Sequence, residues 1–211
     1  ISRGVLSTRQ VYEHILSHNI PWEQTEKLIQ ELAWRDYWQQ VWVAKGEGIN
    51  SDLKNNQEQV GHYELPKAVI NAGTGIKAID DGVQDLYDTG YMHNHMRMYV
   101  ASICSNIAHS HWLEPAKWMY FHLLDGDLAS NQLSWQWVAG AFSNKKYYAN
   151  QDNINTFFNS SQKNTFLDLD YDAFSQLQTP QVLTETIAFD LQTTLPDVEQ
   201  QRLQQNKTTL I

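Results

Sequence analysis

Apolar residues spaced three and four apart between positions 76 and 140 are the feature that most constrains this chain, because that spacing places them on one side of an α-helix. One such stripe ends at Gly90, a residue type that favours the end of a helix. Its members are Ile76, Ile79, Val83, Leu86 and Tyr87. A second stripe follows at once, at Met92, Met96, Val100, Ile103 and Ile107, and the other side of that segment carries Asn94, Arg97, Ala101 and Cys104. Both sides of the second helix are therefore expected to be covered.

The remaining helices are predicted from their ends and their spacing. Ser7 followed by Gln10 has the spacing of a capping box, which starts a helix. A long helix is expected from about Pro21 to Lys45, where Gly46 stops it. Two shorter helices are expected over residues 115–124 and 128–140.

The rest of the chain is less regular. Residues 49–75 show no clear period, residues 143–165 are rich in Asn, Ser and Lys, and the chain after Ser175 is rich in Gln and Thr, so the last two segments are interpreted as surface loops and a tail. Alternating strand patterns are scarce and no internal repeat is found. We predict an all-α domain over residues 1–175 and a polar extension over residues 176–211.

Composition limits the function classes. With 211 residues, the chain is long enough for one generous domain or two small ones. The net charge of -9 weakens a prediction of DNA binding without excluding it, because aromatic side chains can also hold single strands and the chain has eight Trp. Cys104 is the single cysteine, and no apolar run approaches the ~20 residues of a membrane span. A soluble cytoplasmic protein is expected, with a true start upstream of Ile1.

Glu31, Trp34 and Arg35 lie at positions i, i+3 and i+4, so a carboxylate, an indole and a guanidinium share one helix face. Such a face can form a binding surface. The alternative is an ordinary amphipathic helix with a surface ion pair, and spacing alone favours that alternative because such pairs are common.

Asn94 and Arg97 share a face of a helix that is expected to be covered, so Arg97 needs an anion. Asp125 and Asp127 are the candidates. The glycine between them permits a tight bend, and the two carboxylates can diverge, one toward an arginine and one toward a ligand. Alternatively, Asp127 caps the helix that follows it.

Trp135 and Trp137 are two residues apart, about 200° around a helix, and so point in nearly opposite directions. One can face a cofactor and the other a cleft, and burial of both in the core is the alternative. His14 and His18 have the spacing of a metal pair, but no third ligand is evident, so no metal site is predicted.

Taken together, these segments resemble the FAD domain of the DNA photolyase and cryptochrome family, in the family's order and spacing over most of residues 1–140. ELAWRD from Glu31 is similar to the family's ELxWREF, and TGYMHNHMRM from Thr89 is similar to TGWMHNRxRM. DGDLASN from Asp125, continued by WQW up to Trp137, is similar to DGDLAxNxGGWQW.

The resemblance implies a cofactor, FAD, and a role for each matching residue. The implied FAD-binding residues are Arg35, Asn94, Arg97, Asp125, Asp127 and Asn131, with Arg97 paired with Asp125 beside the flavin ring and Asn131 facing the flavin N5. The implied electron-transfer residues are Trp135 and then Trp112, with His62 or Tyr63 near the position of the third. The implied residues around a flipped-out pyrimidine dimer in DNA are Glu31, Trp34, Asn94, His95 and Trp137.

The chain also departs from the family pattern. The family's amino-terminal α/β antenna domain has no counterpart, and residues 1–7 resemble the end of a segment whose earlier part holds the FAD diphosphate. His95 stands where the family has an arginine, and Leu133 and Ser134 stand where it has paired glycines. Residues 145–150 are closer to the iron-sulfur branch of the family, whose cluster a single cysteine cannot hold.

Three hypotheses follow. The first is light-driven electron transfer by bound FAD with repair of dipyrimidine lesions, in single-stranded more than in duplex DNA. The second is a cryptochrome-like light or redox sensor that signals through a protein partner. The third is a subunit whose α/β antenna domain comes from a separate polypeptide.

Overall fold

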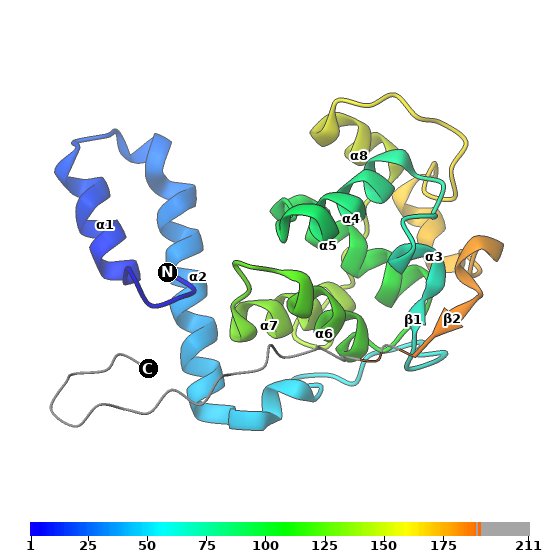
Figure 1. Cartoon of the computed structure of the whole chain (residues 1–211), viewed down its shortest axis with the longest axis horizontal. Helices are drawn as coiled ribbons and strands as arrows, with labels where there is room; N and C mark the ends of the chain where they lie inside the picture. Colours follow the sequence, from blue (N-terminus) through cyan, green and yellow to red (C-terminus); the bar gives the residue numbers. More distant parts are fainter. Residues whose placement is uncertain (189, 191–211) are drawn as a thin grey trace, which may run out of the picture.

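The computed structural model describes residues 1–188 and 190, and these form a mostly helical fold (Figure 1), which confirms the predicted all-α class. The α-helices are α1 (Thr8–Ser17), α2 (Trp22–Lys45), α3 (Lys67–Ile70), α4 (Lys77–Thr89), α5 (Asn94–Ser102), α6 (Leu113–His122), α7 (Leu128–Ala139) and α8 (Gln151–Phe158). The short helices are η1 (Gly46–Asn50), η2 (Ile103–Ile107), η3 (Tyr171–Gln176) and η4 (Gln181–Leu183). The strands are β1 (Leu65–Pro66) and β2 (Thr186–Ile187).

The first two helices form a hairpin at one side of the molecule, next to α7 (Figure 1). The capping box is confirmed at α1, because the Ser7 side chain accepts from the Gln10 backbone and the Gln10 side chain accepts from the Ser7 backbone. The long helix is confirmed as α2, with Gly46 at its C-cap. No helix among the described residues is long and apolar enough to cross a lipid bilayer.

The core lies between α4, α5, η2, α6 and α7. Gly90 caps α4 in the left-handed conformation, as predicted. The prediction that both sides of α5 are covered holds for most of the helix, where Met96, Tyr99 and Ala101 are buried, whereas Asn94 in its first turn is exposed. The close approach of α4 to α5 needs Gly82, because a Cβ there would lie 2.7 Å from Cγ of Met96.

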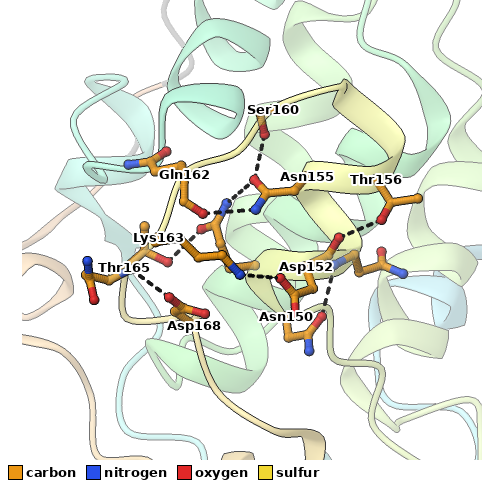
Figure 2. A network of polar contacts seen from close by, with 12 residues as sticks. Asn150, Asp152, Asn155, Thr156, Ser160, Gln162, Lys163, Thr165 and Asp168 are labelled. Carbon is orange, nitrogen blue, oxygen red and sulfur yellow. Dashed lines mark hydrogen bonds and ion pairs between the residues drawn. The ribbon is translucent and has the colours of Figure 1, made fainter.

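The segment 143–165, predicted to be a surface loop, contains helix α8. Its two ends are asparagines, which explains the loop-like composition: Asn150 caps the first turn through its side chain, and Asn159 ends the helix in the left-handed conformation. Ile154 is fully buried between them. Figure 2 shows how the turn after α8 is tied down by Asn155, which accepts from the Ser160 hydroxyl and donates to the carbonyl of Gln162.

Part of the segment after Ser175, predicted to be a tail, packs on the helices. Leu183 is fully buried, and β2 pairs antiparallel with β1, with Leu65 opposite Ile187. The prediction of a tail was wrong for these residues, because two short strands and one buried leucine produce no periodic pattern of apolar residues in the sequence. Residues 189 and 191–211 of the predicted tail lie outside the described residues, and the division of the chain at residue 175 stays a prediction.

Candidate functional site

A cavity of about 470 Å³ lies between α2, α5, α6 and α7, a size typical of sites for cofactors and other small molecules. Most of the site residues predicted from the sequence line it, although they come from three separate segments. They are Glu31, Trp34, Arg35, Asn94, Arg97, Asp125, Asp127, Asn131, Trp135 and Trp137. His95 and Trp112 do not line it.

Arg97 and Asp125 form one side of the cavity. Nη2 of Arg97 donates to both carboxylate oxygens of Asp125, at 3.0 and 2.9 Å, and its Nε donates to the carbonyl of Met92 at 2.7 Å. The guanidinium also lies 5.8 Å from the centre of the Tyr91 ring. The predicted ion pair is therefore present, but it is not buried as expected, since the Arg97 and Asp125 side chains are 25% and 50% exposed. The pair faces the open side of the cavity.

Asp127 is the better buried carboxylate, with 13% of its side chain exposed. Its Oδ1 accepts from the backbone N–H of Ser130 at 2.9 Å, so it caps α7, and its Oδ2 accepts from Nη2 of Arg35 at 2.9 Å. Nε2 of Gln39 donates to both oxygens. The cap considered from the sequence is thus correct. The two carboxylates accept from different arginines and both line the cavity, so the expectation that one of them faces a ligand stays a prediction.

The cavity has apolar walls and few uncompensated charges. The apolar side chains in its lining are Trp38, Met98, Ala101, Met119, Leu123 and Val138. Each arginine is paired with an aspartate, so the cavity suits a flat, largely uncharged aromatic group with polar edges better than it suits a polyanion. Nε of Arg35 is buried without a hydrogen-bond partner among the described residues, and a buried donor of this kind is normally paired with a ligand or an ordered water.

Asn131 lines the cavity from the first turns of α7. Its Nδ2 donates to the carbonyl of Ala116 at 2.9 Å and to Oε1 of Gln132 at 3.0 Å. These bonds hold the amide of Asn131 in one orientation. Asn94 reaches the cavity from the first residue of α5, where the ring of His93 accepts from the His95 backbone and caps the helix.

Two indoles flank the mouth of the cavity. Trp34 on α2 is 51% exposed and Trp137 on α7 is 40% exposed, so both present aromatic surface to solvent. The ring of Trp34 lies tilted against that of Trp38 on the same helix, with the ring centres 5.1 Å apart. Trp135 is 2% exposed, in keeping with the opposite directions that the sequence predicts for it and Trp137. Glu31 lies on the same helix face as Trp34 and is exposed.

His95 lies in an aromatic cluster instead of the cavity. Its ring centre lies 4.1 Å from that of Phe157 on α8 and 5.3 Å from that of His93. Burial lowers the pKa of His95, and the neighbouring His93 lowers it further. The resemblance implied that His95 lies near DNA, and that role stays a prediction. The contact with Phe157 was not expected because α8 was not predicted.

Trp112 is fully buried at the start of α6. Its indole Nε1 donates to Oδ1 of Asp52 at 2.6 Å, and Oδ2 of the same carboxylate accepts from the backbone of Gln57 at 2.7 Å. Sequence reasoning missed Asp52 and Gln57, because both lie in the segment without a helical period and no motif marks them.

Comparison with known proteins identifies relatives over this same region. A family model described as the FAD binding domain of DNA photolyase matches residues 28–172. The chain is 34% identical over 116 residues to a deoxyribodipyrimidine photo-lyase of Streptomyces griseus, covering 54% of this chain and 26% of that protein. It is 30% identical over 152 residues to cryptochrome DASH of Gloeobacter violaceus, covering 66% of this chain and 29% of that protein. The chain thus spans less than a third of the length of these relatives.

Solved structures agree with the sequence matches. A Synechocystis sp. PCC6803 cryptochrome aligns with a TM-score of 0.66 and 25% identity, covering 75% of this chain and 34% of that chain. A bacterial class III photolyase from Agrobacterium tumefaciens aligns with a TM-score of 0.62 and 22% identity, covering 89% of this chain and 45% of that chain. The second likeness, at this identity, concerns the fold alone.

Proposed function

This chain belongs to the family of the DNA photolyase FAD-binding domain, and from that premise we propose that it is a light-driven flavoprotein that repairs dipyrimidine lesions in DNA. FAD is the cofactor of the family. The observation that carries the repair assignment is the pair of exposed indoles, Trp34 and Trp137, at the mouth of the cavity beside the Glu31 carboxylate.

The residues suited to hold the flavin ring are those of the cavity wall. Arg97, Asp125 and Asn131 offer hydrogen-bonding groups, and Met98 and Val138 offer apolar surface. When bound, FAD supplies the absorption of light and the transfer of an electron. The protein contributes position and electrostatics: the Arg97–Asp125 pair keeps a positive charge next to the ring without leaving it uncompensated.

Trp135 and Trp112 are proposed to supply electrons from the protein side. Trp135 lines the cavity from α7, and Trp112 lies at the start of the neighbouring helix α6. Both side chains are almost fully buried. Burial holds each indole in one position and keeps water away from it, which favours electron movement between rings over side reactions.

Trp34, Trp137 and Glu31 are proposed to receive the lesion. A flipped-out base gains about 1–3 kcal/mol from stacking on an aromatic side chain, which helps to offset the cost of unstacking it from the strand. The exposed Glu31 carboxylate can accept hydrogen bonds from base N–H groups. Single-stranded DNA is the favoured substrate, because duplex binding depends on phosphate contacts from Lys and Arg and the net charge is -9.

The test uses the protein loaded with reduced FAD and a single-stranded oligonucleotide that contains a pyrimidine dimer. We expect illumination to restore the two bases and darkness to leave the dimer intact. Trp34→Ala and Trp137→Ala should each weaken oligonucleotide binding by roughly 5-fold to 100-fold, the equivalent of one lost stacking contact, while FAD absorbance stays. Absence of light-dependent restoration by FAD-loaded protein would refute the repair assignment.

A cryptochrome-like sensor is the second candidate, favoured by the likeness to cryptochrome DASH and to a Synechocystis cryptochrome. Such a sensor would signal through a protein partner and repair nothing. The two functions separate by mutation: a sensor keeps its biological output in Trp34→Ala and Trp137→Ala but loses it in Trp135→Phe. A separate α/β antenna polypeptide is a further proposal, which the mass of the native complex in solution tests directly.

A further inference from the structure

The indole N–H of Trp112 donates to a carboxylate, which is an unusual partner for a buried tryptophan. The distance between Nε1 and Oδ1 of Asp52 is 2.6 Å, Trp112 is fully buried, and the Asp52 side chain is only 16% exposed. Trp118 shows the ordinary arrangement in the same core, where the indole N–H donates to the neutral hydroxyl of Tyr87 at 3.1 Å. Hydrogen bonds to a charged acceptor are shorter and about twice as strong as neutral ones.

The carboxylate of Asp52 is held in place by the residues around it. The backbone of Gln57 donates to Oδ2 of Asp52, while Oε1 of Gln57 accepts from the backbone of Trp112 at 2.9 Å. Nε2 of Gln57 donates to the carbonyls of Ser105 and Ser110, at 3.3 and 2.9 Å. Residues of the loop 52–57 therefore accept hydrogen bonds from both the backbone and the indole of Trp112. The Asp52 side chain cannot rotate away without breaking these hydrogen bonds.

A path of rings leads from Trp112 to the surface. Nε2 of His111 lies 3.4 Å from Oδ1 of Asp52, and its ring centre lies 5.7 Å from that of Trp112. The ring of Tyr63 stacks on His111 with centres 5.2 Å apart, and Tyr63 is 68% exposed. His62 is engaged elsewhere, with Nε2 3.0 Å from the carbonyl of Ala108. Of the two candidates for the outer end of the path, Tyr63 is the one that the stacking connects to Trp112.

We propose that Asp52 is a positioning residue that stabilises Trp112 when it loses an electron, and that Tyr63 is the exposed donor that refills it. The proposal rests on the proposed function, which supplies FAD as the light-driven electron acceptor. Loss of an electron leaves positive charge on the indole of Trp112, and a carboxylate hydrogen-bonded to its N–H favours that charged form over the neutral one.

In the first proposed step, Trp112 gives one electron inward, toward Trp135, and becomes a radical cation. Tyr63 then gives one electron to Trp112 through the stacked rings and its phenolic proton to solvent, which restores Trp112 and leaves a neutral tyrosyl radical. An external thiol donates a hydrogen atom to that radical and restores Tyr63. For each electron delivered to the flavin side, the thiol loses one hydrogen atom and becomes a thiyl radical, and one proton is released to solvent.

Asp52→Asn tests the role of the charge, because the amide oxygen can accept the same hydrogen bond without the negative charge. In protein without flavin, the NMR resonance of the Trp112 indole proton should move upfield in the variant, while that of Trp118 stays in place. In FAD-loaded protein, the yield of light-driven flavin reduction should fall roughly tenfold, the equivalent of exchanging a charged for a neutral hydrogen bond. Asp52→Glu should restore both readouts in part.

Tyr63→Phe tests the outer donor. This variant should lengthen the lifetime of the Trp112 radical in transient absorption and abolish a tyrosyl signal in electron paramagnetic resonance. Tyr87→Phe is the matched control, since it removes the phenol that is hydrogen-bonded to the buried indole of Trp118, and it should change neither readout. A folded Asp52→Asn protein with unchanged indole resonance and unchanged photoreduction overturns the assignment of Asp52, and an unchanged radical lifetime in Tyr63→Phe overturns that of Tyr63.

The two levels of failure are distinguishable. Wild-type protein that binds oxidised FAD but shows no light-driven oxidation of tryptophan contradicts the proposed electron supply by Trp135 and Trp112, whereas repair is judged separately with reduced FAD. Wild-type protein that photoreduces normally, alongside variants that behave like it, leaves the function intact and removes only the roles of Asp52 and Tyr63. Should Asp52→Asn fail to fold, the indole resonance and photoreduction yield of Asp52→Glu, which keeps the charge but shifts it, decide the question.

Discussion

Replacing Asp127 by alanine should destabilise the fold far more than replacing Asp125, although both aspartates pair with an arginine beside the same cavity. Asp127 accepts hydrogen bonds from the α7 backbone, from Arg35 and from Gln39, and its side chain is 13% exposed. Asp125 accepts from Arg97 alone among the described contacts, and its side chain is 50% exposed. The comparison isolates the effect of burial and capping on otherwise similar ion pairs.

The expected size follows from the contacts. Loss of the N-cap costs about 1 kcal/mol. Loss of a charged hydrogen bond in a mostly buried site costs about 1.5–3 kcal/mol, because the guanidinium of Arg35 is left without its partner. Asp127→Ala should therefore lower the free energy of unfolding by about 2.5–4 kcal/mol. Asp125→Ala should lower it by at most about 1 kcal/mol, since solvent screens a half-exposed pair.

The assay is urea unfolding of the flavin-free protein, followed by tryptophan fluorescence. Asp127→Asn is the matched control, because asparagine also caps helices well but carries no charge, so its cost should fall between the other two. The burial argument fails if Asp127→Ala and Asp125→Ala shift the unfolding midpoint equally, or if Asp127→Asn is as damaging as Asp127→Ala. The second outcome would assign the whole effect to charge and none to the cap.

Three further predictions test other parts of the structure. Leu183→Ala should cost about 2–5 kcal/mol of unfolding free energy because this side chain is fully buried, whereas its exposed neighbour Val182→Ala should cost little, and equal costs in urea unfolding would contradict the packing of this segment. Burial raises the pKa of the Cys104 thiol, so iodoacetamide should label it only as fast as the protein unfolds, and rapid labelling of folded protein would contradict its burial. The pKa of His109 is lowered by burial and by the nearby Lys146 and His62. As the pH falls, His109 is protonated in the unfolded chain before it is protonated in the folded protein, so the free energy of unfolding should decrease below about pH 6.5. His109→Asn, which tolerates the φ of 60° at this position, should make that fall shallower in unfolding measured from pH 7 to 5, and an unchanged slope would exclude His109 as a contributor.

The helices and much of the cavity could be predicted because their signals are local. Ser7 with Gln10 starts α1, Gly90 ends α4, and apolar spacing marks the segments between such ends. The same local spacing grouped Glu31 with Trp34 on one helix face, and the resemblance to a known family assigned each a role. Helix α8 was missed because its caps are asparagines, which also mark loops.

Pairings between distant residues needed the tertiary structure. The resemblance implied that Arg97 pairs with Asp125, and the structure contains that pair. Only the packing of α2 against α7 decided that Arg35 pairs with Asp127. The spacing of residues in the sequence does not identify an ion-pair partner, because it indicates which helix face a residue occupies and not which residue of another helix lies next to that face.

The same holds for Asp52 and Trp112, which are 60 positions apart and joined only by the fold. The amino-acid sequence by itself determined that the chain is helical, where most helices begin and end, and which residues resemble those of a flavin pocket. The tertiary structure decided which charges neutralise one another and which buried indole has a carboxylate partner, because these depend on how non-adjacent segments approach one another as the core excludes water.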